Sequence, residues 1–452
     1  MQITLFEFAI CSLFQIFCTQ SSSRDTSENI FTISLDLQSS RPQISTNMAS
    51  VIVVENDLKD SVNEYSQIID GVHQNTEFSA SLSAFLPEGS ATVTNPTELA
   101  SAIFAASTKE TLTSLSDKEF EPAFYLLVFL LTKLENQTIE QLTTQDSKII
   151  SLLKSCTPTE QPSLRDRRSL KPTTILSIFN TLFNLLPASS SNRIQLINSI
   201  LAVVAETNTS FAFIQSSIGH SLVSWLKDAG ASEAEIKQIF WFFITLDTEF
   251  TLESLQLIKT FTTQFQLSIE ELRTLITFAL SSSVVDVSFL VNNNVATALS
   301  QNSSDELVQT FVQYTHSDLI STVPESLPES IKHKSKILCL AKFFVENGTK
   351  ENNNTFKYSD IPSALASSPA DFEKLLVDSI KAGVIEGKLN QVEETFFSIR
   401  TNRCILAGDD NKLAQDWDTV KAALMEWKHS LENINEVVLN AKENIVNNNN
   451  AN

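Results

Sequence analysis

The chain has 452 residues, of which 42% are hydrophobic, so it is long and apolar enough for two or three globular domains. Its formal net charge is -21, and residues 1–330 carry 36 acidic against 17 basic side chains. Nucleic-acid binding depends on clustered Lys and Arg, so this acidity argues against direct DNA binding and favours protein partners. Only 8 Gly and 12 Pro are present, which favours long helices joined by polar loops.

The first 47 residues allow three interpretations. Their apolar beginning is similar to a signal peptide, but Glu7 interrupts the run and the first basic residue is Arg24. The run is also too short and too polar to predict a membrane span. We therefore expect translation to start at Met48, so that residues 1–47 are not part of the fold. The alternatives are a secreted protein and a translated, disordered extension.

Residues 58 to 348 consist of one apolar-periodic segment after another. Apolar side chains recur at the three- and four-residue spacing of amphipathic helices, and segments are separated by Ser, Thr, Asn or Asp. Asp117, Ser232, Thr251 and Ser268 are placed as N-caps, and Ser232 and Ser268 have a glutamate three residues later, as in a capping box. The pattern predicts an α-solenoid of helical pairs, divided into an N-terminal helical region (48–170) and a second helical part (171–348).

Two stretches in this region stand out from the pattern. The basic cluster Arg165, Arg167, Arg168 and Lys171 is a candidate contact patch for ribosomal RNA or an acidic partner, although a solvated loop has the same composition. The aromatic run around Trp241 is apolar on every side, which predicts a helix buried between neighbours.

The sequence offers no pattern for catalysis or cofactor binding. Its 5 Cys are widely spaced, its 5 His lack metal-ligand spacing, and no glycine-rich phosphate loop or nucleophile motif is present. We therefore predict a protein that is not an enzyme, binds no metal or cofactor, and works in a reducing compartment such as the cytoplasm.

The segment 349–411 departs from the all-helical pattern. After a polar linker, a short helix (361–366) and a longer one (370–382) are expected. Gly383 is expected to end the second helix in the left-handed conformation, Gly387 to turn the chain, and residues 395–399 to form a strand. Helix, helix, strand, turn and strand together predict a winged helix.

The second of these helices carries acidic side chains where a DNA-binding winged helix has basic ones. Asp371, Glu373 and Asp378 stand against Lys374 and Lys381, a balance that disfavours phosphate and favours protein contacts.

A long helix is expected over residues 412–446, followed by an Asn-rich tail (447–452). Its apolar positions alternate by threes and fours, as in a coiled coil. At 1.5 Å per residue, positions 413–438 would span about 39 Å, longer than a small domain covers. We expect Trp417, Leu424 and Trp427 to pack on the winged-helix sheet. The candidate subunit interface comprises Leu431, Ile434 and Val438 of this helix with Phe397 and Ile399 of the strand.

A helical solenoid that ends in a non-basic winged helix and a long helix resembles the PCI-domain subunits of the proteasome lid, the cullin-deneddylating signalosome and eukaryotic translation initiation factor 3. The resemblance is sharpest with the subunit M family of the initiation factor. It rests on the stretches "IKAGVIEGKLNQVEETFFSIRTNRCI" and "WDTVKAALMEWKHSLENI". The matching positions are Lys388, Leu389, Gln391, Arg403, Trp417, Leu424, Trp427 and Lys428. One departure is the longer connection "CILAGDDNKLAQDW".

The resemblance implies a non-catalytic scaffold in the cytoplasm. Its partners would be the other PCI and related subunits and, through the complex, the small ribosomal subunit, with no DNA and no membrane. Winged helices of such subunits pair edge to edge and their terminal helices gather in a bundle. A subunit of the signalosome or of the proteasome lid is the alternative.

Overall fold

The computed structural model describes residues 57–87, 93–144, 147–158, 168–207, 209–348, 354–402 and 410–450. The chain divides into two units, Met1–Met48 and Ala49–Asn452, and every described residue belongs to the second. The expected extension over residues 1–47 lies outside the described residues.

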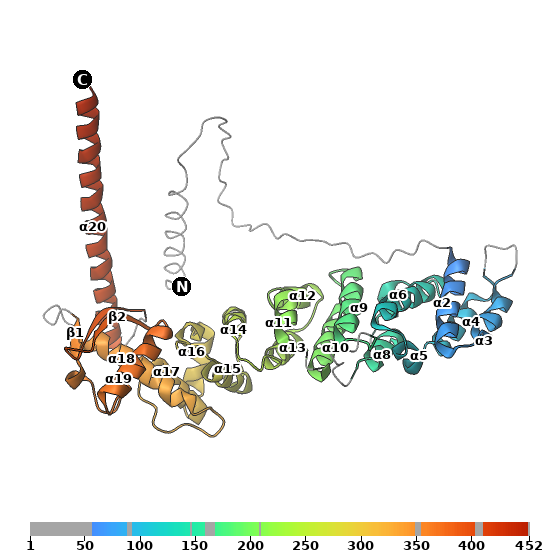
Figure 1. Ribbon diagram of the computed structural model, residues 1–452, viewed down its shortest axis with the longest axis horizontal. Helices are drawn as coiled ribbons and strands as arrows, with labels where there is room; N and C mark the ends of the chain where they lie inside the picture. The colour runs from blue at the N-terminus through green and yellow to red at the C-terminus, as the bar shows by residue number, and fades with distance from the viewer. Residues whose placement is uncertain are drawn as a thin grey trace. The chain divides into compact units, whose positions relative to one another are not determined.

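Helices follow one another through the first three quarters of the described chain, and no strand interrupts them there (Figure 1). Helix α9 packs on α10, α12 on α13, and α15 on both α16 and α17, which confirms the predicted solenoid of helical pairs. The helices are α2 (Leu58–His73), α3 (Glu77–Leu82), α4 (Pro96–Ala106), α5 (Lys109–Thr113), α6 (Asp117–Leu134), α7 (Ile139–Leu142), α8 (Lys148–Ser155), α9 (Pro172–Leu185), α10 (Asn192–Thr207), α11 (Phe211–Ile214), α12 (Leu222–Asp228), α13 (Glu233–Thr245), α14 (Leu252–Gln264), α15 (Ile269–Ser281), α16 (Asn293–Gln301), α17 (Glu306–Thr315) and α18 (Ser330–Asn347).

Side-chain caps define where several of these helices begin. Ser232 and Ser268 each form a capping box with the glutamate three residues later, and the Thr251 hydroxyl accepts a hydrogen bond from the Ser254 amide, as predicted. The prediction for Asp117 is wrong by one position. Ser116 is the N-cap of α6, while the Asp117 carboxylate accepts hydrogen bonds from Lys171 and Thr174 at the start of α9.

Aromatic side chains fill the core in the middle of the solenoid. The Phe240 and Phe261 rings stack with centroids 3.8 Å apart, and Trp241, only 8% exposed, meets Phe261 edge-on. The predicted burial of the helix around Trp241 is confirmed, except that Phe242 on its outer side is exposed.

Helix α18 connects the solenoid to the C-terminal part of the chain. Near its beginning, Lys334 is buried, and its ammonium donates hydrogen bonds to the carbonyl oxygens of Leu280 and Ser282 at the end of α15. Near its end, the ring of Phe344 lies 4.7 Å from Phe356 and 5.1 Å from Phe396, between centroids. One helix therefore contributes to both cores.

The winged helix consists of α19 (Pro369–Lys381) and an antiparallel sheet of β1 (Thr355–Lys357), β2 (Ile385–Asn390) and β3 (Thr395–Thr401) in the order β1-β3-β2. This confirms the predicted fold class. The short helix expected at 361–366 is absent, because residues 358–360 form a single 3-10 turn and the chain then continues in turns. Strand β1 was not predicted, because its three residues end a polar run.

Gly383 has the predicted left-handed conformation, with φ of 71°. The amides of Gly383 and Val384 donate to the carbonyls of Ile380 and Ser379, which is the Schellman ending of a helix. The expected role of Gly387 is wrong. It lies inside β2 next to a bulge, and the chain turns instead through residues 391–394, where Glu394 has a φ of 50°.

Helix α20 spans Asp410–Asn450, so it begins two residues before and ends four residues after the predicted 412–446. At 1.5 Å per residue its 41 residues reach about 60 Å. Side chains of α20 are described at positions 417, 418, 420–422 and 424–442. Among the helices in the described ranges, none combines the length and the apolar character of a membrane span.

Candidate assembly interface

The winged-helix sheet has one buried and one open face. Along β3, Phe396 and Ser398 are buried, whereas Phe397 and Ile399 point the other way and are 38% and 51% exposed. Phe397 lies between Thr355 of β1 and Lys388 of β2 in the sheet register. The two residues predicted as interface thus form an apolar strip on the open face, and their role in assembly stays a prediction.

Helix α19 stabilises the turn between β2 and β3 through hydrogen bonds to Glu373. The Glu373 carboxylate accepts hydrogen bonds from the Tyr358 hydroxyl at 2.9 Å and from the Gln391 side-chain amide at 2.8 Å. Burial, followed by this contact with Glu373, raises the pKa of Tyr358 to about 12. At the tip, Val392 is 94% exposed. The turn therefore presents an apolar side chain on a fixed support, which the sequence analysis missed.

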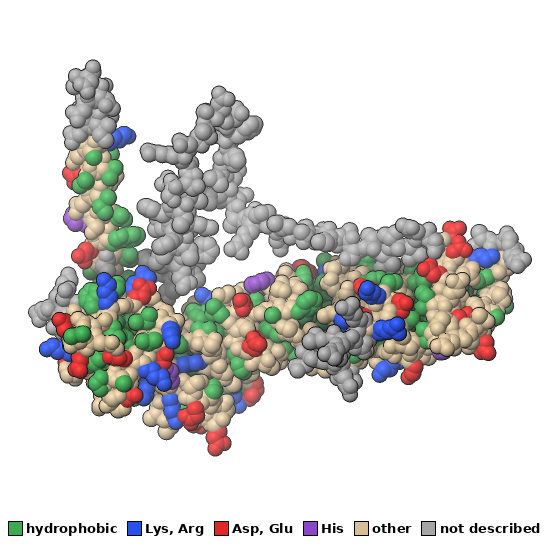
Figure 2. Space-filling model, viewed as in Figure 1, with side chains coloured by type: hydrophobic (Ala, Val, Ile, Leu, Met, Phe, Trp, Pro, Cys, Tyr) green, Lys and Arg blue, Asp and Glu red, His purple; other side chains and the backbone are tan. Residues whose placement is uncertain are grey.

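Helix α20 carries the apolar seam predicted from its spacing, and Figure 2 shows green side chains gathered along it. The expectation that Trp417, Leu424 and Trp427 are buried is wrong for the isolated chain, because Trp417 is 44% and Trp427 is 61% exposed. The physical reason is that a periodic apolar seam predicts a face to be covered without specifying that the covering surface belongs to the same chain.

The second half of the seam is open in the same way. Leu431, Ile434 and Val438 are between 40% and 60% exposed. Three large apolar side chains on one face of a helix are unfavourable in contact with water, so this face favours contact with another protein. Their exposure fits the predicted interface without testing it.

The acidic side chains of α19 are engaged by neighbours. Asp371 accepts hydrogen bonds from the hydroxyls of Ser367 and Ser368, which lower the pKa of its carboxyl, and Asp378 meets the His333 ring at 3.0 Å. Lys374 and Lys381 are exposed. The acids of this helix thus act mainly within the domain.

The basic cluster is only partly within the described chain, because Arg165 and Arg167 fall outside it. Lys171 forms an ion pair of 2.9 Å with Asp117, and the Arg168 carbonyl accepts a hydrogen bond from the Asp117 amide. Asp117 thus holds two of the four residues at the start of α9. Contact with RNA through this cluster stays a prediction.

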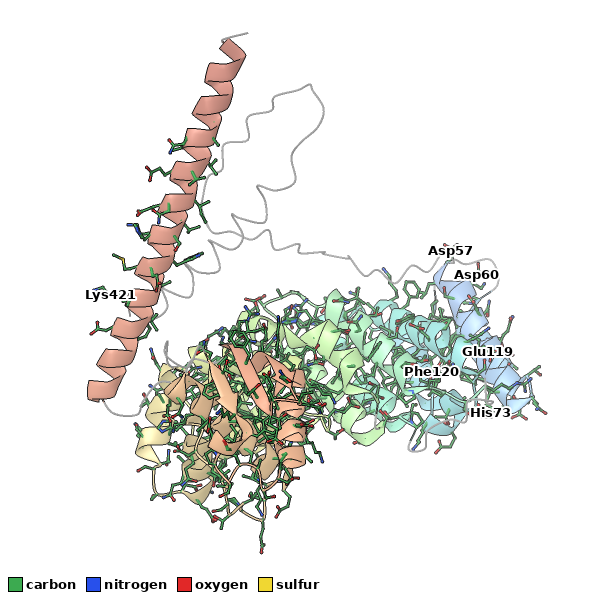
Figure 3. The ribbon with its side chains drawn as sticks, turned by 60° about the vertical axis from the view of Figure 1, so that its left-hand side comes forward. Asp57, Asp60, His73, Glu119, Phe120 and Lys421 are labelled. Carbon is green, nitrogen blue, oxygen red and sulfur yellow. The ribbon has the colours of Figure 1, made fainter. Side chains whose placement is uncertain are left out.

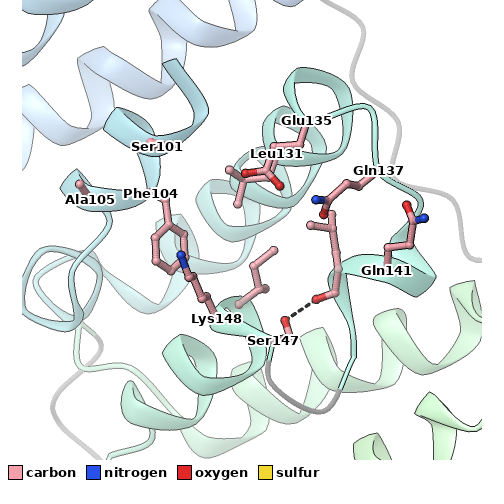
Figure 4. A pocket seen from close by; sticks show the side chains of 11 residues that line it. Ser101, Phe104, Ala105, Leu131, Glu135, Gln137, Gln141, Ser147 and Lys148 are labelled. Carbon is pink, nitrogen blue, oxygen red and sulfur yellow. Dashed lines mark hydrogen bonds between the residues drawn. The ribbon is translucent and has the colours of Figure 1, made fainter. Parts of the chain in front are cut away.

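A cleft of about 500 Å³ opens among α4, α6, α7 and α8 (Figure 4). The Lys148 ammonium lies 5.9 Å from the centre of the Phe104 ring, and the Ser147 hydroxyl donates to the Leu142 carbonyl. Glu135, Gln137 and Gln141 complete its polar rim. The described lining residues include no His or Cys, and the serine hydroxyl has a backbone partner, so this lining offers no nucleophile paired with a base.

Metal ligation has no candidate within the described ranges, where no group of three or more His, Cys, Asp or Glu side chains converges. The described cysteines are Cys156 and Cys339, and burial raises the pKa of both thiols.

Comparison with known proteins agrees with this geometry. A PCI domain matches residues 311–399, the stretch from α17 through the winged helix to β3. The chain is 26% identical over 363 residues to eukaryotic translation initiation factor 3 subunit M of Aspergillus clavatus, covering 74% of this chain and 72% of that protein. It is 27% identical over 299 residues to the subunit M of Coccidioides immitis, covering 61% and 62%. It is 26% identical over 371 residues to that of Emericella nidulans, covering 74% and 75%. The chain thus carries a PCI domain and is similar, over about three quarters of its length, to subunit M of eukaryotic translation initiation factor 3.

Proposed function

We propose that this chain is a scaffold subunit of the eukaryotic translation initiation factor 3 complex, in the position of subunit M, and that it has no catalytic activity of its own. Similarity to subunit M over 74% of the chain is the observation that carries the proposal. That similarity extends well beyond the PCI domain at 311–399, so it includes much of the helical solenoid.

The exposed apolar surfaces support an assembly role. Two are on the winged helix: the strip of Phe397 and Ile399, and the tip at Val392. The third is the seam of α20. Contiguous apolar surface on a soluble chain marks contacts with other proteins, and the partners proposed here are the other PCI and related subunits. Through them the chain would help place the complex on the small ribosomal subunit in the cytoplasm.

The proposal is tested by affinity purification of the tagged full-length chain from its own cells, followed by mass spectrometry. Recovery of the other initiation-factor subunits in stoichiometric amounts is expected. Recovery of cullin-directed signalosome subunits or of proteasome-lid subunits would reject the proposal in favour of that assembly.

A chain that stops after Lys428 separates the seam from the rest of the molecule. The shortened chain keeps the solenoid and winged helix and loses Leu431, Ile434 and Val438, so it should fold but recover fewer partners. Equal recovery of every partner would show that the second half of α20 is not an assembly surface. Peptidase or nucleotidase turnover by the purified chain would contradict the absence of catalysis.

A further inference from the structure

The apolar seam of α20 has two chemically different edges. One edge consists of Lys421, Lys428 and Lys442, which directly follow Val420, Trp427 and Ala441 of the seam, position 441 continuing its spacing three residues after Val438; we call it the basic edge. Spacings of 7 and 14 residues put the three lysines on the same side of a helix whose seam alternates by threes and fours. In the sequence, the residues that directly precede Trp417, Leu424, Leu431 and Val438 on the other edge are Asp416, Ala423, Ser430 and Val437, so one of the four is charged.

The three lysines are accessible along the seam. All are exposed, and Figure 3 shows Lys421 standing out from α20. The nearest partner of Lys428 is Glu432, at 3.8 Å, and both side chains are more than 60% exposed, so this pair contributes little. Lysine stems can lie along an apolar seam while their ammonium groups reach a partner beside it.

We infer that the helix which covers the α20 seam belongs to a different protein chain and carries Asp or Glu along the edge that meets Lys421, Lys428 and Lys442. The inference rests on the proposed function and adds the chemistry of the partner. Charged residues that flank a coiled-coil seam select the partner and its orientation, because unlike charges attract across the seam and like charges repel.

A second copy of this chain is a poor occupant of the seam. In an antiparallel pair the basic edge of one copy would face the basic edge of the other, so lysine would oppose lysine. In a parallel pair Asp416 would face Lys421, but Ala423 and Val437 offer no carboxylate to Lys428 and Lys442, so two of the three lysines would stay unmatched. Neither arrangement matches the charges, whereas an acidic helix from another chain does.

An anionic membrane surface fits less well. Helices that lie on membranes carry Lys and Arg over their polar face. The polar face of α20 instead carries Asp418, Glu426 and Glu436, all exposed, which anionic lipid would repel. The charge distribution therefore favours a protein helix.

The first experiment measures binding of two synthetic heptad peptides to the full-length chain by fluorescence anisotropy at low salt. Both peptides have Leu and Ile along the seam; one has Glu on both edges and the other has Lys. The native chain should bind the Glu peptide about tenfold more tightly, as expected for three weak ion pairs together, and salt should reduce this preference.

Charge reversal supplies the decisive comparison. The variant Lys421→Glu/Lys428→Glu/Lys442→Glu should prefer the Lys peptide. A matched control, Lys109→Glu/Lys118→Glu/Lys154→Glu, makes the same change in net charge at exposed positions of the solenoid and should bind like the native chain. The inference is overturned if the native chain binds both peptides equally, binds neither, or forms seam-dependent homodimers in analytical ultracentrifugation. Stronger binding to phosphatidylserine-containing vesicles than to either peptide would also overturn it.

The second experiment separates this inference from the proposed function. The native, reversed and control chains are each used for affinity purification from cells. If initiation-factor subunits are recovered with the native and control chains and lost with the reversed chain, the inference is supported. If all three chains recover them equally, the inference fails while the proposed function stands. If the native chain recovers none, the proposed function fails, and the peptide preference alone decides the inference.

Discussion

Gly387 offers a sharp test of how the winged helix is packed. A Cβ atom added at this position would lie 2.2 Å from Cζ of Phe396 and 2.5 Å from the carbonyl oxygen of Phe397. Both distances are far inside van der Waals contact. Glycine is therefore required because β2 approaches the Phe396 ring closely, and replacing it with alanine should destabilise the hairpin.

The size of the effect follows from how little Phe396 can move. Its side chain is fully buried, and its ring lies against Phe344 from α18. Forcing an extra methyl group into such a core costs roughly 1–3 kcal/mol, and the lower unfolded-state entropy of alanine offsets roughly 0.4–1 kcal/mol of that. A net loss of about 1.3 kcal/mol for Gly387→Ala is expected.

Hydrogen exchange measured by mass spectrometry on the full-length chain reports this loss locally. Peptides from β2 and β3 should exchange about tenfold faster in Gly387→Ala, because about 1.4 kcal/mol corresponds to a factor of ten in an opening equilibrium. Peptides from the first helices should not change.

The matched control is Gly71→Ala in α2. No atom lies within 4 Å of a Cβ at Gly71, so alanine should stabilise that helix by up to about 1 kcal/mol and slow its exchange. Unchanged or slower exchange in β2 and β3 of Gly387→Ala would refute the reasoning about close approach to Phe396.

Three further outcomes are expected. Trp427→Ala should change the free energy of unfolding in urea by no more than about 0.5 kcal/mol, whereas Trp241→Ala in the core should cost about 3–5 kcal/mol; comparable losses would contradict the exposure of Trp427. Burial lowers the pKa of Lys334 to about 8, below its unfolded value, so between pH 8 and about 10.5 the unfolded chain binds a proton that the folded chain does not. The free energy of unfolding of the native chain should therefore rise with pH in this window relative to that of Lys334→Met. Urea titrations of both chains at about pH 7.5 and about pH 10 measure this, and an equal pH dependence of the two chains would refute the lowered pKa of Lys334. Ser232→Ala removes the N-cap of α13 and should cost about 1 kcal/mol, while Ser430→Ala inside α20 should not; equal unfolding midpoints for the two variants would count against the cap.

Much of the architecture could be predicted because local rules determine it. Apolar spacing gave the helices of the solenoid, and the Ser-x-x-Glu pattern gave the starts at Ser232 and Ser268. The same pattern at Ser116 and Glu119 was overlooked in favour of Asp117, although Asp117 serves a contact with α9 that only the folded chain reveals.

The errors arise where distant contacts decide the outcome. A glycine between apolar residues suits a turn or a close approach equally well, and only the buried ring of Phe396 selects the second for Gly387. A regular seam indicates that α20 will be covered but not whether the covering surface is in the same chain, which is why Trp417 and Trp427 were misplaced. The role of Glu373 beneath the turn depends on Tyr358 and Gln391, which are 15 and 18 residues away.

Helix α18 has a mechanical consequence for the assembled protein. Its Lys334 is fastened to the end of α15, and its Phe344 forms the floor under β1 and β3. A fragment that starts after residue 348 would lose that floor, so a hairpin excised there should unravel, while one that starts before α17 should hold. In a complex, force applied to the winged helix would be transmitted to the solenoid through α18, which contacts α15 through Lys334 and the sheet through Phe344. The orientation of α15 and α18 would therefore determine the direction in which the open face of the sheet points.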